Sequence, residues 1–152
     1  MTITTHSAEE TLRLGQKLGK VLRGREVLEL KSDIGGGKTT FTKGIAEGMG
    51  SNDTVQSPTF TISLHYQCSG RKELHHYDFY RLHDAGVVQA QLAESLHQDD
   101  IVTVIEWSDV VAHVLHEPVV VIYIKKGSGE NDREFLFEIP EEFSYLNEAI
   151  SK

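Results

Sequence analysis

The sequence predicts one α/β domain of three layers, built on a mixed, mostly parallel central sheet with antiparallel edge strands. Apolar, strand-like segments alternate along the chain with segments of helical periodicity, an order typical of helices that cover both faces of a parallel sheet. Three glycines stand between the first such strand and the next helix, and two late strands follow each other across a turn. A length of 152 residues suits a single core, so we expect one domain over residues 1–152.

The elements follow from local patterns. A capping box, "SAEE", opens a run of leucines at helical spacing, and "GKTTF" after the glycines opens a second helix. "TFTISLHYQ" alternates with a period of two and "KELHHYDFYR" returns across a turn, which predicts an antiparallel hairpin, while "DIVTVIEW" reads as a central buried strand. In chain order we expect helix 8–23, strand 25–31, helix 38–49, strands 59–67 and 72–81, helix 85–97, strands 100–107, 117–126 and 133–140, and helix 141–150.

Composition and charge exclude several classes of protein. The net charge of −8 argues against a protein that grips nucleic acid by neutralising its phosphates. No apolar run approaches the roughly 20 residues that cross a bilayer, and the N-terminus lacks the pattern of a signal peptide. Cys68 is the only cysteine, so no internal disulfide can form. We therefore expect a cytoplasmic protein without a membrane or disulfide partner.

The glycine run fits a phosphate-binding loop. The pattern for such a loop is G-x-x-x-x-G-K-[ST], and residues 32–39 read S-D-I-G-G-G-K-T, with Ser32 in place of the first glycine. The glycines let backbone amides approach phosphates closely, Lys38 would reach the β- and γ-phosphates, and the Thr39 hydroxyl would bind Mg²⁺. A small residue with negative φ suits the position of Ser32, with its side chain directed away from the phosphates. The sequence thus predicts a nucleotide site in a P-loop NTPase-like domain.

Hydrolysis requires a carboxylate at the end of a neighbouring strand, and "IVTVIE" supplies Glu106. Asp78 in "HYDFYR" is a second candidate, which would orient water or sense the nucleotide. "SPTF", at 57–60, offers hydroxyls for a γ-phosphate switch. Each of these also fits an ordinary strand end or turn. Trp107, the only tryptophan, fits stacking near the site, and packing in the core or at the surface almost as well.

Other patterns narrow the choice. No N-K-x-D guanine signature occurs, which disfavours a Ras-like GTPase. His75, His76 and His83 lack a convincing metal-ligand spacing, so we expect them to face solvent.

Four motifs in this order, "SDIGGGKTTFTKGIAEGMG", "SPTFTI", "HYDFYRL" and "IEW", make the chain similar to the TsaE (YjeE) ATPases of bacterial tRNA threonylcarbamoyladenosine biosynthesis. The resemblance covers nearly the whole chain. It implies an ATPase that needs ATP and Mg²⁺ and is weak alone. Its partners would be TsaB and TsaD, of which TsaD carries the transferase chemistry at adenosine 37. Contact with tRNA would be made only through those partners.

The resemblance also implies roles for particular residues. Ser32 departs from the family's usual G-D-L-G-A-G-K-T, and either Thr39 or Thr40 would share the metal with Glu106. The implied catalytic residues are Lys38, Asp78 and Glu106. The implied nucleotide-binding residues are Thr11, Asp33, Gly35, Gly36, Gly37, Lys38, Thr39, Thr40, Phe41, Thr59, Trp107 and Arg133.

Two alternative functions remain open at this stage. Small-molecule P-loop kinases share the loop and the size, although no arginine cluster follows the helix expected at 85–97. A nucleotide-sensing binding module without functional hydrolysis would also carry the loop. Phosphorylation of a metabolite would identify the first, and tRNA modification supported by a hydrolysis-dead variant would identify the second.

Overall fold

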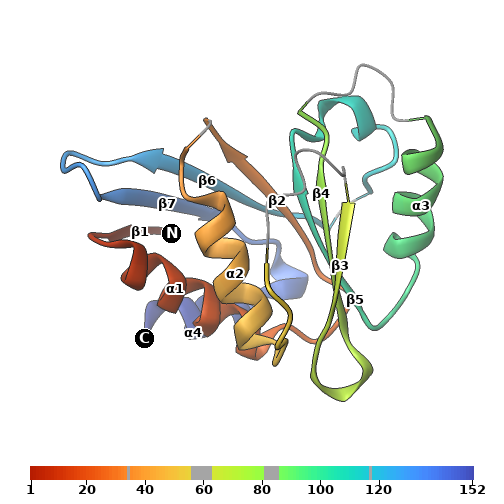
Figure 1. Ribbon diagram of the computed structural model, residues 1–152, viewed down its shortest axis with the longest axis horizontal. Helices are drawn as coiled ribbons and strands as arrows, with labels where there is room; N and C mark the ends of the chain where they lie inside the picture. The colour runs from red at the N-terminus through yellow and green to blue at the C-terminus, as the bar shows by residue number, and fades with distance from the viewer. Residues whose placement is uncertain (34, 56–62, 81–85, 117) are drawn as a thin grey trace.

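The computed structural model describes residues 1–33, 35–55, 63–80, 86–116 and 118–152, without the side chain of Val87. Strands and helices alternate through most of this chain (Figure 1). The elements are β1 (Thr2–Thr5), α1 (Ala8–Val21), β2 (Val27–Ser32), α2 (Lys38–Gly48), β3 (Ser63–Gln67), β4 (Glu73–Asp78), α3 (Gly86–Leu96), β5 (Ile101–Glu106), β6 (Val120–Lys126), β7 (Arg133–Glu138) and α4 (Tyr145–Ser151), with short 3-10 helices η2 (Ser69–Arg71), η3 (Ser108–Val111) and η4 (Glu141–Phe143).

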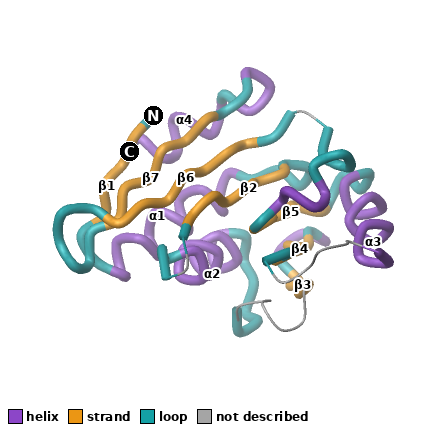
Figure 2. The backbone as a smooth tube through the Cα atoms, turned by 90° about the horizontal axis from the view of Figure 1, so that it is seen from above, coloured by secondary structure: helices purple, strands orange, loops and turns teal. Residues whose placement is uncertain are grey.

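The strands form one mixed sheet of seven, in the order β1-β7-β6-β2-β5-β4-β3 (Figure 2). Strands β6, β2, β5 and β4 run parallel to one another, whereas β7 pairs antiparallel with β6 and β1, and β3 pairs antiparallel with β4. Every residue of β5 is buried, as its near-continuous apolar run predicts. The predicted architecture, a mostly parallel sheet with antiparallel edges, is confirmed.

Helices cover both faces of the sheet. Because side chains alternate along a strand, Leu28 and Val104 pack with α1, α2 and α4, while Val27 and Ile105 pack with α3 and η3 on the opposite face. The first cluster is the larger and includes the aromatic side chains of β7. The three expected layers are therefore present.

Helices α1 and α2 touch backbone to backbone. Gly15 and Gly19 of α1 face Gly44 and Gly48 of α2, and a Cβ added at Gly44 would lie 2.2 Å from the carbonyl oxygen of Leu12. Side chains of any size are excluded there, so the four glycines set the separation of the two helices. This contact fixes α2, whose first turn follows the glycine loop.

Strand β1 was not expected. Its four residues, T-I-T-T, are too few and too polar to show an alternation. They form a strand because they pair with β7, where Ile3 lies opposite Phe135. The amino group of Met1 also donates to the carbonyl oxygen of Phe137 at 3.0 Å, which ties the N-terminus to the sheet edge.

Three further expectations concern the hairpin, the histidines and the absence of a membrane-spanning segment. The hairpin of β3 and β4 is confirmed, although residues 59–62 of the expected strand lie outside the described residues. The expectation that His75 and His76 face solvent was wrong, because both are buried in β4, which lies inside the sheet; His83 lies outside the described residues. Within the described ranges, no helix combines the length and apolar character that a membrane crossing requires.

Candidate functional site

The glycine loop joins the end of β2 to the start of α2, at the carboxyl edge of the parallel strands. Gly35 and Gly37 have left-handed backbones, with φ of 79° and 96°, and Gly37 directly precedes the helix. These angles favour glycine because a Cβ would clash with the neighbouring backbone. The loop therefore leads straight into a helix N-terminus, whose free amides and dipole attract anions.

Ser32 ends strand β2, opposite Ile124, so its expected strand conformation with negative φ is confirmed. Its side chain, however, turns into the loop. The hydroxyl donates to the carbonyl oxygen of Asp33 at 3.1 Å, and a Cβ added at Gly36 would lie 1.8 Å from it. Ser32 thus fills the space that the absent Gly36 side chain leaves.

Lys38 reaches back over the loop from the first turn of α2. Its ammonium group donates to the carbonyl oxygens of Ser32 and Asp33, each at 3.2 Å. The same nitrogen lies 5.5 Å from the centre of the Trp107 ring. Asp33 itself is exposed and meets the lysine through its main chain. The Lys38 ammonium therefore lies directly against the backbone of the glycine loop.

Two carboxylates meet at the same edge. Glu106 ends β5 and Asp78 ends β4, and the two residues are register partners. Since register partners share a face, both lie on the face covered by α2, as Leu28 and Leu74 do. Glu106 is 3% exposed and Asp78 is 6% exposed. Two carboxylates this deeply buried require compensation by polar or cationic neighbours.

His76 supplies such a neighbour for Glu106, and the sequence analysis missed it. The imidazole Nε2 lies 3.1 Å from Glu106 Oε2. Because the side chains of β4 alternate, His76 shares its face with Leu74 and Asp78. The alternation in "LHHYD" was the available signal, since it places one of the two histidines on the face of Asp78.

Trp107 connects the loop with the carboxylate strands. It follows Glu106 with a left-handed backbone, φ 55°, which is unusual for a bulky residue. Its ring is 4.8 Å from that of Tyr80, and the Tyr80 amide donates to Asp78 Oδ1 at 2.9 Å. With the Lys38 ammonium 5.5 Å from its centre as well, the indole lies near both Lys38 of α2 and Tyr80 after β4. It is 36% exposed, so it lies at the surface of the site and not in the core.

A small hollow of about 80 Å³ lies on the other flank of the loop. It is lined by Ala8, Thr11, Gly37, Thr40, Asn131 and Arg133. The Arg133 guanidinium donates through one Nη to the carbonyl oxygens of Glu130 and Asp132, and its Nε is buried without a hydrogen-bond partner within the described part of the chain. That Nε would lie 3.7 Å from a Cβ at Gly37. The structure thus brings Thr11, Thr40 and Arg133 together beside Gly37 of the loop.

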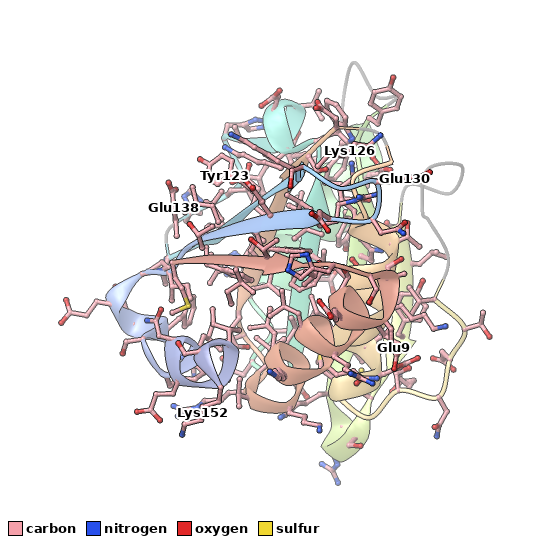
Figure 3. All side chains as sticks on the ribbon, turned by 90° about the vertical axis from the view of Figure 1, so that its left-hand side faces the viewer. Glu9, Tyr123, Lys126, Glu130, Glu138 and Lys152 are labelled. Carbon is pink, nitrogen blue, oxygen red and sulfur yellow. The ribbon has the colours of Figure 1, made fainter. Side chains whose placement is uncertain are left out.

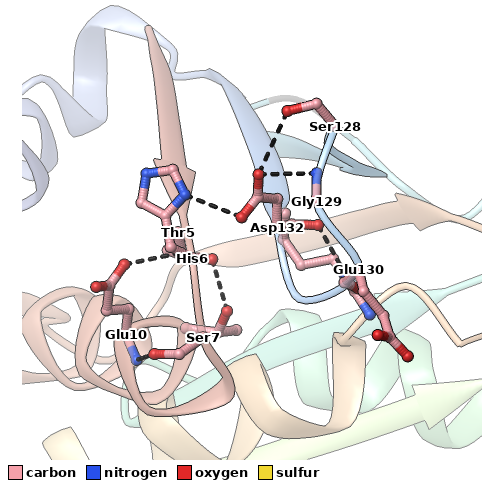
Figure 4. Close-up of polar contacts among 10 residues, drawn as sticks. Thr5, His6, Ser7, Glu10, Ser128, Gly129, Glu130 and Asp132 are labelled. Atoms are coloured by element: carbon pink, nitrogen blue, oxygen red, sulfur yellow. Dashed lines mark hydrogen bonds and ion pairs between the residues drawn. The ribbon is translucent and has the colours of Figure 1, made fainter.

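The turn between β6 and β7 is tied to the start of α1 beside this hollow (Figure 4). His6 Nδ1 lies 2.9 Å from Asp132 Oδ1, and Asp132 also accepts from the Gly129 amide. The hydrogen bond and the charge of Asp132 raise the pKa of His6, and the bond to His6 lowers the pKa of Asp132. The contact fixes the turn that leads into Arg133.

Two expected residues need comment. The Phe41 side chain is fully buried, with its ring centre 5.0 Å from that of Phe135, because it lies on the core side of α2. A nucleotide could reach only its main chain. Thr59 lies outside the described residues, as does the whole "SPTF" segment.

The described residues hold no group of three or more His, Cys, Asp and Glu side chains that could bind a metal by themselves. Among the described residues, the oxygen ligands at this edge are the Glu106 and Asp78 carboxylates and the threonine hydroxyls of α2. A larger cavity, of about 790 Å³, is lined by Arg23, His97 and Tyr145 among others, and by no residue of the glycine loop and neither Asp78 nor Glu106. The glycine loop and the two buried carboxylates therefore lie away from this cavity.

Comparisons with known proteins agree on one family. A family model described as "Threonylcarbamoyl adenosine biosynthesis protein TsaE" matches residues 5–135. The chain is 36% identical over 149 residues to a tRNA threonylcarbamoyladenosine biosynthesis protein TsaE of Bacillus subtilis, covering 97% of this chain and 92% of that protein. It is 36% identical over 125 residues to the protein of the same name from Treponema pallidum, covering 82% and 91%. The crystal structure of Bacillus subtilis YdiB superimposes with a TM-score of 0.81 at 32% identity, covering 99% of this chain and 93% of that one.

Proposed function

The chain belongs to the TsaE family of threonylcarbamoyl adenosine biosynthesis proteins, and on that premise we propose that it is a Mg²⁺-dependent ATPase. It acts in the cytoplasm as an accessory of tRNA N6-threonylcarbamoyladenosine formation at adenosine 37. Its partners are TsaB and TsaD, and it is weak on its own. The observation that carries the proposal is the contact of Trp107 with both Lys38 and Tyr80, directly after Glu106.

The residues of the loop fit a triphosphate. The left-handed glycines open the backbone before α2, and the Lys38 ammonium lies over the loop, held by carbonyl oxygens that an anion would replace. On the other flank, the buried Arg133 Nε has a hydrogen to donate and no partner within the described residues. A buried donor of this kind is satisfied when an anionic or polar ligand enters. Cations therefore stand on both sides of the loop.

The position of Thr40 favours Thr39 as the metal threonine. Thr40 lines the hollow with Thr11 and Arg133, on the side of β7 and α1. Glu106 lies on the opposite side of β2, in β5. We therefore assign the metal to Thr39 and Glu106, and Thr40 to the nucleotide. This assignment supports Mg²⁺ because hydroxyl and carboxylate oxygens are ligands that Mg²⁺ prefers.

Bound Mg²⁺ would neutralise phosphate charge and so lower the barrier to attack by water. Lys38 would hold the phosphates and stabilise the negative charge that develops on them. Asp78, buried beside Glu106, would accept a hydrogen bond from the attacking water and orient it. Trp107 and Tyr80 would cover the site and limit the access of bulk water.

The charge of the chain supports docking on proteins instead of tRNA. Acidic side chains such as Glu9, Glu130 and Glu138 accompany Lys126 and Lys152 on the side of α1, β6, β7 and α4 (Figure 3). With a net charge of −8, binding through phosphate neutralisation is disfavoured. The exposed Trp107 and Tyr80 are suited to contact a partner, since such aromatic side chains are enriched at interfaces.

The proposal is tested by ATP hydrolysis measured with and without TsaB–TsaD, beside a tRNA modification assay. Lys38→Ala should weaken ATP binding or hydrolysis by roughly tenfold to a hundredfold, because charge-assisted contacts contribute about 1.5–3 kcal/mol. Glu106→Gln should lower hydrolysis more than nucleotide binding. Asp78→Asn should also lower hydrolysis if Asp78 orients the water.

Lys43→Ala is the matched control for Lys38→Ala, because Lys43 lies on the same helix with its side chain exposed. It should leave binding and turnover unchanged. Unchanged ATP binding and turnover in folded Lys38→Ala would remove the proposal. Modification supported by Glu106→Gln without hydrolysis would identify a nucleotide-sensing module, and a phosphorylated metabolite would identify a kinase.

A further inference from the structure

We propose that His76 is a positioning residue for Glu106, which it holds at the carboxyl edge of the sheet through its Nε2–H group. This inference rests on the proposed ATPase function, and it adds a residue that the motif comparison leaves without a role. His76 would not touch the nucleotide. It would act through the carboxylate alone.

The side chains of His76 and Glu106 are both buried from solvent. His76 is fully buried, Glu106 is 3% exposed, and Nε2 lies 3.1 Å from Oε2. The register pairs Asp78 with Glu106 and His76 with Val104. The Glu106 side chain therefore bonds to the ring of His76, which lies two residues before the register partner of Glu106 and on the same face of the sheet.

This contact compensates a buried charge. A carboxylate removed from water needs a hydrogen-bond donor, and the imidazole provides the one hydrogen bond that the Glu106 carboxylate makes within the described part of the chain. With Oε2 held by the ring, Oε1 has no hydrogen bond to any described residue and can serve a metal ion or water. The orientation of the carboxylate then no longer depends on the ligand.

The other ring nitrogen argues against a simple packing role. His76 Nδ1 is buried and has no partner among the described residues, which a core position would avoid by using an apolar side chain. When Nε2 carries the hydrogen that it donates to Glu106, Nδ1 is a bare acceptor. The contact with the carboxylate therefore accounts for a histidine at this position, although its Nδ1 has no partner among the described residues.

Partners of metal-binding side chains commonly contribute roughly tenfold to a hundredfold in metal affinity or activity. His76→Leu should therefore raise the Mg²⁺ concentration required for half-saturation by about that factor, and lower kcat, with the nucleotide affinity measured without Mg²⁺ unchanged. His76→Gln, which can still donate, should recover part of the loss. The readout besides activity is the fluorescence of Trp107, the only tryptophan, with a non-hydrolysable ATP analogue and Mg²⁺ as the titrants.

His75→Leu is the matched control. His75 is the next residue of the same strand, equally buried, but it faces α3 and contacts Ser95. It should change stability without moving the Mg²⁺ midpoint. In the Glu106→Gln background, His76→Leu should add little further loss, because the histidine acts through that carboxylate.

The failures can be told apart. If the wild-type protein shows no Mg²⁺-dependent binding of the analogue, the proposed function falls and this inference with it. If it binds while folded His76→Leu keeps the wild-type midpoint and kcat, or His75→Leu shifts them equally, only the positioning role is overturned. Should His76→Leu not fold, nitrogen NMR of the histidines in the wild-type chain still decides. His76 should be the Nε2–H tautomer, and the Nδ1–H tautomer would overturn the inference.

Discussion

A serine stands at the position where a phosphate loop usually has its first glycine, and its surroundings show how the loop accommodates it. Ser32 keeps the extended backbone of β2, and its hydroxyl occupies the space above Gly36. The serine therefore leaves the strand unchanged but excludes a side chain at Gly36. Gly37 differs, because a Cβ there would meet only Arg133 at ordinary distances, yet its φ of 96° is unfavourable for any other residue.

This difference predicts a coupling between two loop positions. Ser32→Gly alone should shift ATP affinity by less than about 1.4 kcal/mol, a factor of ten. Gly36→Ala should weaken binding because its Cβ would lie 1.8 Å from the Ser32 hydroxyl, and adding Ser32→Gly should restore part of the loss. Nucleotide titration of the three variants measures the coupling.

Gly37→Ala is the comparison in the same titrations. It should weaken binding whether or not Ser32 is replaced, because its strain is in the backbone and amounts to about 1–2 kcal/mol. Strictly additive effects of Ser32→Gly and Gly36→Ala would contradict the contact between them. A gain of orders of magnitude from Ser32→Gly alone, with no effect of Gly37→Ala, would show that the loop is misread.

The His6–Asp132 contact predicts a pH dependence of stability. Because the pKa of folded His6 is raised above its ordinary 6.5, its contribution is complete below pH 6.5 and is lost as pH rises through the folded pKa. Asp132 has a lowered pKa, so its contribution is complete above its ordinary 3.8 and is lost as pH falls through the folded pKa. The contact should therefore stabilise the fold most between these two values.

Thermal unfolding of wild type and His6→Gln tests this. The gap between their Tm values should be widest near pH 6 and narrow by pH 8.5. The gap should be modest throughout, since both side chains are at the surface and the solvent screens them. Glu9→Gln, which removes the nearby pair of Glu9 with Arg13, should show no such narrowing. A gap independent of pH would contradict the assigned contact.

At the scale of elements, the glycines between α1 and α2 link the fold to the site. The helix that begins at the loop is held in place by backbone contact with α1, where Gly15 and Gly44 approach each other. Any side chain at the contact would push α2 away and move Lys38 with it. The same glycines lower the intrinsic helix propensity of both segments, so tertiary packing maintains these helices.

Gly44→Ala should therefore destabilise the protein although alanine is the better helix former. Overpacking of this kind costs about 1–3 kcal/mol, against roughly 1 kcal/mol gained in helix propensity. The obstacle is the carbonyl oxygen of Leu12, 2.2 Å from the new Cβ, which is backbone and cannot rotate aside. Denaturant unfolding measures the change, with Lys43→Ala on the exposed side of α2 as the control. A Gly44→Ala protein as stable as wild type would show that the helices can separate freely.

At the scale of the whole molecule, the charge sets what the protein can bind by itself. The chain carries 23 acidic residues and 15 lysines and arginines. Because of this excess of acidic residues, the protein repels a polyanion such as tRNA at long range.

The isolated chain should accordingly bind tRNA weakly at physiological salt. Filter binding or anisotropy with labelled tRNA, repeated at several salt concentrations, measures this. Neutralisation of several phosphates would give a steep loss of affinity with rising salt. Tight and salt-sensitive binding by the chain alone would contradict a role that reaches tRNA only through partner proteins.

The sequence by itself determined the order of the helices and strands that follow β1, the glycine loop and the buried strand that ends in Glu106. These features are written in local periodicity and in short motifs, which neighbouring residues suffice to define. Only the tertiary structure decided that T-I-T-T pairs with β7, that Arg133 reaches Gly37, and that His76 is buried against Glu106. Each of those contacts joins residues far apart in the chain. They exist because the sheet orders its strands differently from the sequence, and no local pattern encodes that order.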